Sequence, residues 1–347
     1  MQRIFFAAFF LISAIGLLVS ACQPLASGPS STLTAPEVAP TPTDTPIGSN
    51  QAACFKTYSD PIAFTPDHSR ILVGANTGVQ VYNLAKQAEE RFLKSPTNLN
   101  RPNAALSPDG ETLAWALEDN TIQLVRVADE KVLHTLVGHT GPITKLRFSQ
   151  TGDRLFSAAD DGWGRVWNMD GAQVNAFQPG GGEVLGIGVS ADGATLATIP
   201  PDGPVKLWDT KDFRKSTELG GTGGYDTSDV AFSPDGHFVA ADLATGLSVW
   251  DATNQTLLWS GVNSMAFAFS PAGNLLAYAD IGDNNKIILV SPDGKQKLNA
   301  LEGHQSPVSM LIFSPDGSLL ASADDMEIRI WRVEDGRLLY IGKSACP

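Results

Sequence analysis

The chain has 347 residues, of which 43% are hydrophobic and 18% are charged, and 37 acidic residues outnumber 24 basic ones. The resulting net charge of −13 argues against nucleic-acid partners and against docking on anionic lipid, because both are negatively charged themselves. The five histidines are scattered, which argues against a transition-metal site, and we expect neither a metal nor any other cofactor.

Residues 1–21 are predicted to be a signal peptide. A short basic start, Met1-Gln2-Arg3, precedes an almost wholly apolar segment over residues 4–19. That segment is short for a membrane span and suits a signal-peptide core. It runs into Val19-Ser20-Ala21-Cys22, which resembles a bacterial lipobox. The resemblance implies that Cys22 is lipidated and becomes the new N-terminus; the alternative is an ordinary secretory signal cut after Ala21.

A lipidated Cys22 places the protein outside the cytoplasm, on the outer face of the cell membrane or on the outer membrane. Gln23 follows, so the aspartate associated with inner-membrane retention in some Gram-negative bacteria is absent. Residues 22–53 then form a linker rich in Ser, Thr, Pro and Ala. Such a composition cannot bury a core and favours extended, polyproline-like conformations.

A turn motif recurs through the remainder of the chain at intervals of roughly 40 residues, which is the period of propeller blades. The motif is based on Ser-Pro-Asp-Gly, and each unit ends in a short apolar run that often contains Trp. The turns occupy residues 64–67, 106–110, 149–152, 190–193, 232–236, 269–273 and 313–317. Seven units fill residues 54–346.

The third unit shows how each unit folds. Apolar runs over residues 143–148, 154–159 and 165–167 are separated by tight turns, and a fourth run follows at 173–177. Runs of this length suit strands better than helices. A single meander cannot bury both its faces, so it needs copies on either side. We therefore predict an all-β, seven-bladed propeller of four-stranded antiparallel blades, as one domain.

These repeats resemble the WD-repeat family of seven-bladed propellers over residues 54–346. Members of that family often carry a buried hydrogen-bond network of His, Ser or Thr, Asp and Trp, and the resemblance implies two complete networks here. The third unit supplies His139, Ser157, Asp161 and Trp167, and the seventh supplies His304, Ser322, Asp325 and Trp331. In the fourth unit only Asp202 and Trp208 match, and the fifth has Trp250 without the histidine.

The grouping of His139, Ser157 and Asp161 also permits a catalytic-triad interpretation. Their positions recur with the blades, however, and a satisfied buried network stiffens a core without performing chemistry. We therefore expect no catalytic residue and no enzymatic activity.

Three residues in predicted loops are candidates for contact with a partner: Trp163, Tyr225 and Met326. Trp163 lies in a turn where the family usually has a small polar residue. The favoured function is a membrane-anchored, monomeric scaffold that binds proteins through this loop face. The alternatives are a ligand-binding or enzymatic propeller with an axial pocket, and a Tol-type periplasmic propeller that works with envelope partners.

The first and seventh units each contain four predicted strands, so we expect the ring to close without a shared strand. Cys54 lies just before the first inner strand and Cys346 just after the last outer strand. With Cys22 lipidated, these are the two remaining cysteines, and an extracytoplasmic setting permits oxidation. We predict a Cys54–Cys346 disulfide that locks the seam.

Overall fold

The computed structural model describes residues 61–75, 78–86, 88–96, 103–179, 182–223 and 229–343. In this part of the chain, seven four-stranded antiparallel sheets are present and no helix, which confirms the predicted fold class. None of its elements is therefore a helix long and apolar enough to span a membrane. The predictions for Cys22, Cys54, Tyr225 and Cys346 fall outside the described residues.

Each sheet, here called a blade and numbered in chain order, consists of four consecutive strands. Blade 1 contains β1 (Pro61–Phe64), β2 (Arg70–Ala75), β3 (Gly78–Asn83) and β4 (Ala88–Lys94). Blade 2 contains β5 (Ala104–Leu106), β6 (Thr112–Ala116), β7 (Ile122–Arg126) and β8 (Val132–Leu136). Blade 3 contains β9 (Ile143–Phe148), β10 (Arg154–Ala159), β11 (Gly164–Asn168) and β12 (Gln173–Phe177). Blades 4 and 5 contain β13 (Gly186–Val189), β14 (Thr195–Ile199), β15 (Val205–Asp209), β16 (Asp212–Gly220); and β17 (Asp229–Phe232), β18 (Phe238–Leu243), β19 (Gly246–Asp251), β20 (Thr256–Val262). Blades 6 and 7 contain β21 (Phe267–Phe269), β22 (Leu276–Asp280), β23 (Lys286–Val290), β24 (Lys297–Leu301); and β25 (Met310–Phe313), β26 (Leu319–Ala323), β27 (Glu327–Arg332), β28 (Leu338–Lys343).

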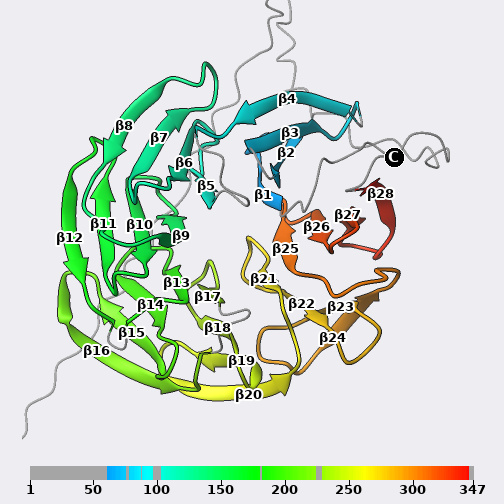
Figure 1. Ribbon diagram of the computed structural model, residues 1–347. Helices are drawn as coiled ribbons and strands as arrows, with labels where there is room; N and C mark the ends of the chain where they lie inside the picture. Colours follow the sequence, from blue (N-terminus) through cyan, green and yellow to red (C-terminus); the bar gives the residue numbers. More distant parts are fainter. Residues whose placement is uncertain are drawn as a thin grey trace, which may run out of the picture. The chain divides into compact units, whose positions relative to one another are not determined.

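The first strand of every blade lies nearest a common centre, and the fourth lies on the outer rim (Figure 1). Consecutive antiparallel strands connect at alternate ends. The turns between first and second strands therefore share one face of the ring with those between third and fourth strands; we call this the 1–2 face. The turns between second and third strands lie on the opposite face, which we call the 2–3 face.

The recurrent Ser-x-Asp-Gly motif closes the turn between first and second strands. In blade 5, the Ser233 hydroxyl donates to Asp235 Oδ1 over 2.5 Å, and the Phe238 amide donates back to Ser233 Oγ over 2.9 Å. Gly236 follows with φ +75°, a left-handed conformation that glycine adopts without steric cost. The side chains thus fix the turn locally, which explains why the full motif recurs in blades 2, 4, 5 and 7 and a variant of it in the other three.

The hydrophobic core is divided into seven clusters, one between each pair of neighbouring blades, including blades 7 and 1. Small side chains in the second strands allow neighbouring blades to approach each other closely. At one equivalent second-strand position, alanine occurs in five blades and is 0% exposed in each: Ala114, Ala197, Ala240, Ala277 and Ala321. The recurrence of alanine at this position is therefore explained by blade-on-blade packing.

The ring closes between blades 7 and 1 without a shared strand, as predicted. The side chains of Phe64 and Ile71 from blade 1 pack with those of Ile328 and Ile330 from blade 7. At the same seam, Tyr82 and Tyr340 are joined by a 2.7 Å hydrogen bond between their hydroxyls. Burial raises the pKa of Tyr82, so the phenol stays protonated and available for this bond.

Candidate functional site

Two of the predicted contact residues lie at equivalent turns of the 2–3 face. Trp163 lies between β10 and β11, and Met326 lies between β26 and β27. The Met326 side chain projects from its turn, and the residue is 57% exposed. Trp163 is half-buried, and the guanidinium of Arg165 lies over its ring, 5.9 Å from the centroid. A cation over an aromatic face holds the indole in one orientation.

Beneath Trp163, blade 3 contains the network that the sequence predicted. His139 Nδ1 lies 3.0 Å from Asp161 Oδ2, and His139 Nε2 lies 2.7 Å from Ser157 Oγ. The indole N–H of Trp167 donates to the same Ser157 oxygen over 2.8 Å. The structure thus brings all four side chains together in one continuous chain of hydrogen bonds.

Chemistry fixes the direction of these bonds. The Asp161 carboxylate can only accept, so the proton of the imidazole lies on Nδ1 and Nε2 accepts from the serine hydroxyl. Burial lowers the pKa of His139, which keeps the ring neutral near pH 7. Burial alone would raise the pKa of Asp161, but amide donors from Thr140 and Trp163, together with His139, outweigh it and lower the pKa.

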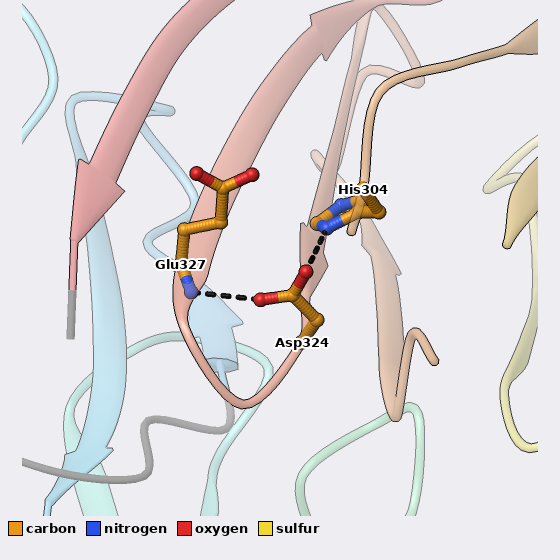
Figure 2. Close-up of side chains that lie close together, drawn as sticks. All are labelled: His304, Asp324 and Glu327. Atoms are coloured by element: carbon orange, nitrogen blue, oxygen red, sulfur yellow. Dashed lines mark hydrogen bonds and ion pairs between the residues drawn. The ribbon is translucent and has the colours of Figure 1, made fainter. Parts of the chain in front are cut away.

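Blade 7 contains the same network with one correction to the sequence-based assignment. The carboxylate beside His304 belongs to Asp324 and not to Asp325: His304 Nδ1 lies 2.8 Å from Asp324 Oδ2 (Figure 2). Asp325 is exposed at the next position of the turn. The other members, Ser322 and Trp331, form the network as predicted, with Ser322 Oγ 2.7 Å from His304 Nε2 and 2.8 Å from Trp331 Nε1.

The assignment of Asp325 was wrong because the two turns differ in length. Four residues separate β10 from β11, whereas three separate β26 from β27. Counting back from the tryptophan finds the correct aspartate in blade 3. In blade 7 the same count leads to Asp325, one residue after Asp324. In the shorter turn, the first residue after the strand is the one that faces the histidine.

Both network aspartates also hold the backbone of the contact residue above them. Asp161 Oδ1 accepts from the Trp163 amide over 3.0 Å, and Asp324 Oδ1 accepts from the Met326 amide over 2.8 Å. In each case, the residue held is two positions beyond the aspartate. The buried networks therefore extend to the surface and fix the two turns that carry Trp163 and Met326.

His304, Asp324 and Glu327 form a group whose ligand atoms lie within 4.8 Å of one another, a spacing that could hold a metal ion. These atoms are already engaged in hydrogen bonds and an ion pair within the fold. Both ring nitrogens of His304 are hydrogen-bonded, and Glu327 Oε1 pairs with Arg329 Nε at 2.5 Å. Figure 2 shows Asp324 bridging the histidine and the Glu327 amide. The group therefore stabilises the turn between β26 and β27 through hydrogen bonds.

The triad interpretation of His139, Ser157 and Asp161 also fails on geometry. Ser157 is 0% exposed, and its oxygen both donates to the histidine and accepts from Trp167. A nucleophile needs an approach path for a substrate carbonyl, and the fully buried Ser157 oxygen offers none.

Sequence reasoning missed one member of a partial network in blade 4. The indole N–H of Trp208 donates to Thr198 Oγ1 over 2.8 Å, whereas Asp202 is exposed. Thr198 lies ten residues before Trp208, the same spacing as Ser157 to Trp167, and that spacing could have identified it. In blade 5, the indole of Trp250 donates to the Leu219 carbonyl over 3.1 Å.

Comparison with known families agrees with this geometry. The family model described as "WD domain, G-beta repeat" matches residues 130–168 and 295–332. Each matched segment contains one complete His-Ser-Asp-Trp network. The matches begin at the outer strand of the preceding blade, so the sequence repeat is offset from the blade by about one strand.

Three curated relatives are similar over larger parts of the chain. WD repeat-containing protein SL1-17 of Schistosoma mansoni is 31% identical over 183 residues, which is 50% of this chain and 60% of the relative. Apoptotic protease-activating factor 1 of Rattus norvegicus is 28% identical over 237 residues, 68% of this chain and 16% of the relative. COMPASS component SWD3 of Saccharomyces cerevisiae is 23% identical over 300 residues, 76% of this chain and 90% of the relative.

The chain therefore spans less than two thirds of the first two relatives and most of the third. The described part of the chain is therefore a seven-bladed β-propeller, and two of its segments, residues 130–168 and 295–332, match the WD40 repeat.

Proposed function

We propose that this protein is a scaffold, held outside the cytoplasm by a lipid on Cys22, that binds protein partners through its 2–3 face. The observation that carries the proposal is the arrangement of Trp163 and Met326. Each projects from a turn whose backbone is fixed by a buried aspartate. Large apolar side chains that are at least partly exposed on a rigid support lose little conformational entropy on binding, so they are suited to protein contact.

The named relatives support the binding role. One carries the name of a component of the COMPASS assembly, and another that of a protease-activating factor. WD-repeat propellers generally act by bringing proteins together, and the networks described above have a structural role that agrees with scaffolding. An enzymatic role would need reactive groups at an accessible site, which the buried networks do not supply.

The proposed location rests on the sequence. An apolar segment over residues 4–19 and the lipobox-like run up to Cys22 are typical of exported lipoproteins. The Ser/Thr/Pro/Ala-rich linker over residues 23–53 would span up to about 3 Å per residue and so could hold the propeller away from the bilayer.

Site-specific photo-crosslinking in intact cells tests the proposed contact face. A benzophenone amino acid at position 163 or 326 should yield a discrete adduct with a partner protein. The same probe at Ala272, an exposed residue on the 1–2 face, is the matched control and should not yield that adduct. Adducts that do not differ between the two faces, or no adduct from either 2–3 position, would contradict the proposed contact face.

The anchor needs a separate measurement. In Cys22→Ser, the protein should leave the membrane fraction or persist as an uncleaved precursor. Mature wild-type protein that begins at Cys22 without an acyl group would contradict lipid anchoring, and the crosslinking result would stand independently of that outcome.

A further inference from the structure

The two faces of the ring differ in charge. Each fourth strand ends at the 2–3 face, so the connections between blades lie there together with the turns between second and third strands. In the described part of these turns and connections, ten residues are acidic and none is lysine or arginine. The turns of the 1–2 face are also acidic, but they include five basic residues: Lys86, Lys131, Lys211, Lys295 and Arg337. Negative charge is therefore less balanced by positive charge on the 2–3 face.

Five of the ten acidic residues lie on three successive blades, 2 to 4. Glu118 and Asp119 lie in the turn between the second and third strands of blade 2, and Asp160 lies in the equivalent turn of blade 3. Glu183 lies in the connection from blade 3 to blade 4, and Asp202 lies in the turn of blade 4. We call these five residues the acidic arc.

Most of the other acidic residues of this face have partners within the fold. Asp161 and Asp324 are the carboxylates of the two buried networks. Asp283 and Glu302 both pair with Lys286, whose Nζ lies 3.0 Å and 3.3 Å from their carboxylate oxygens. The acidic arc therefore holds much of the negative charge that the 2–3 face leaves unbalanced.

The acidic arc is accessible, and two of its members are neighbours. Four members are exposed, and Glu183 is half-buried beside Asp160. The segments that carry this pair are in contact, since a Cβ atom on Gly162 would lie 3.1 Å from the carbonyl oxygen of Gly182. Burial, the charge of Asp160 and a hydrogen bond between the two side chains raise the pKa of Glu183. A cation next to two adjacent carboxylates would stabilise the charged form of both.

Three basic residues lie near the acidic arc, at the adjoining strand ends. Arg165 Nη2 lies 4.0 Å from Asp161, and Lys206 Nζ lies 3.6 Å from Glu218. Neither of these carboxylates belongs to the arc, so the two cations are offset by acidic residues outside it. Lys145 is half-buried in β9 and adds one positive charge against five carboxylates. The arc therefore keeps a net negative charge when these cations are counted.

Trp163 adds an apolar surface within the acidic arc. It lies in the same turn as Asp160, and its half-buried ring is held by the guanidinium of Arg165. Lysine and arginine side chains combine an apolar stem, which can pack on an aromatic ring, with a charged end that can reach a carboxylate. The indole and the carboxylates are separate features, and both fit side chains of this kind.

We propose that the acidic arc binds a segment of the partner protein that is rich in lysine and arginine, with Trp163 as its apolar contact. The inference rests on the proposed function, because it specifies the chemistry of the partner that the 2–3 face binds. Opposite charge draws such a segment to this face and orients it, whereas acidic segments are repelled. The packing of a side chain on Trp163 then adds a short-range contact.

Fluorescence anisotropy on the purified protein tests the inference. The probe is the labelled peptide Lys-Ala-Lys-Ala-Leu-Ala-Lys-Ala-Lys, which should bind saturably at low salt. The same peptide with glutamate in place of each lysine should not bind. Raising the salt concentration from about 0.05 M to about 0.5 M should weaken binding of the lysine peptide by about tenfold or more, because salt screens exposed charges.

Charge-reversal variants locate the binding site. The triple variant Glu118→Lys, Asp160→Lys, Asp202→Lys should weaken binding of the lysine peptide by about tenfold or more. The matched control Glu111→Lys, Asp170→Lys, Glu334→Lys changes the net charge equally, at exposed positions in turns of the 1–2 face, and should stay within about twofold of wild type.

Trp163→Ala removes the apolar contact and should weaken binding of the lysine peptide by about threefold or more. Unchanged thermal unfolding confirms that all three variants are folded. The inference is overturned if the lysine peptide does not bind, if the two triple variants bind equally, if the glutamate peptide binds as tightly, or if Trp163→Ala binds like wild type. In any of these cases, a crosslinked adduct from position 163 in cells would still support the contact face, so the two proposals can fail separately.

Discussion

Removing the oxygen at the centre of the blade 3 network should be among the most damaging single-atom changes in this protein. Ser157 Oγ accepts from Trp167 Nε1 and donates to His139 Nε2, and the residue is 0% exposed. In Ser157→Ala, the indole donor and the imidazole acceptor both lose their partner in a place that water does not reach. A buried polar group left without a partner costs about 1–3 kcal/mol, so the two together cost about 2–6 kcal/mol.

Blade 4 offers a matched comparison. Thr198 Oγ1 accepts from Trp208 Nε1, but no histidine completes a network there. Thr198→Val keeps the shape of the side chain and leaves one buried donor without its partner, at a cost of about 1–3 kcal/mol. The reasoning therefore predicts that Ser157→Ala lowers the free energy of unfolding by about twice as much as Thr198→Val.

Equilibrium urea unfolding, followed by tryptophan fluorescence and circular dichroism, measures both losses. Equal slopes against urea in wild type and variants would show that the same amount of surface is exposed, so the midpoints can be compared directly. A loss below about 0.5 kcal/mol for Ser157→Ala, or equal losses for the two variants, would refute the view that the complete network of blade 3 stabilises the fold more than the single hydrogen bond of blade 4.

Three further predictions concern the interior, a close contact and the seam. The free energy of unfolding should fall as pH drops below about 6.5, because burial lowers the pKa of His139 and the unfolded chain then binds a proton that the folded chain binds only at lower pH. In urea titrations at pH 7.5 and 5.5, His139→Gln should show a smaller fall than wild type. An identical fall in both proteins would contradict this prediction. Gly188→Ala should lower the thermal midpoint by an amount equivalent to about 1–3 kcal/mol or more, since its Cβ would meet Val230 O at 2.5 Å, whereas Gly282→Ala, with an aspartate oxygen at 3.3 Å as its nearest neighbour, should have a much smaller effect. Protein purified without reductant should contain a Cys54–Cys346 disulfide, whose reduction lowers thermal stability by up to about 5 kcal/mol without loss of strand content; two free thiols in a thiol assay would rule the bridge out.

The blades could be predicted from sequence because their determinants are local. The Ser-x-Asp-Gly turn carries its own hydrogen bonds, as Ser233 and Asp235 show, and it marks the same position in successive blades. The fourth strand of blade 3 was predicted at residues 173–177, the bounds of β12. The absence of a shared strand at the seam followed from counting complete units.

The remaining features depend on distances that sequence does not encode. The choice between Asp324 and Asp325 follows from a turn that is one residue shorter than its counterpart, and a fixed count from the tryptophan cannot detect that difference. The close approach of blades 4 and 5, which Gly188 permits because a Cβ there would lie 2.5 Å from Val230 O, likewise carries no recognisable sequence motif.

Amide hydrogen exchange tests most directly the claim that buried networks fix the turns of the 2–3 face. The amides of Trp163 and Met326 are held by Asp161 and Asp324, so both should exchange slowly in wild type although their turns lie at the surface. Asp161→Ala should release the Trp163 amide and leave the Met326 amide protected, and Asp324→Ala should do the reverse. Rapid exchange at both amides in wild type would contradict the claim, as would protection that survives removal of the aspartate.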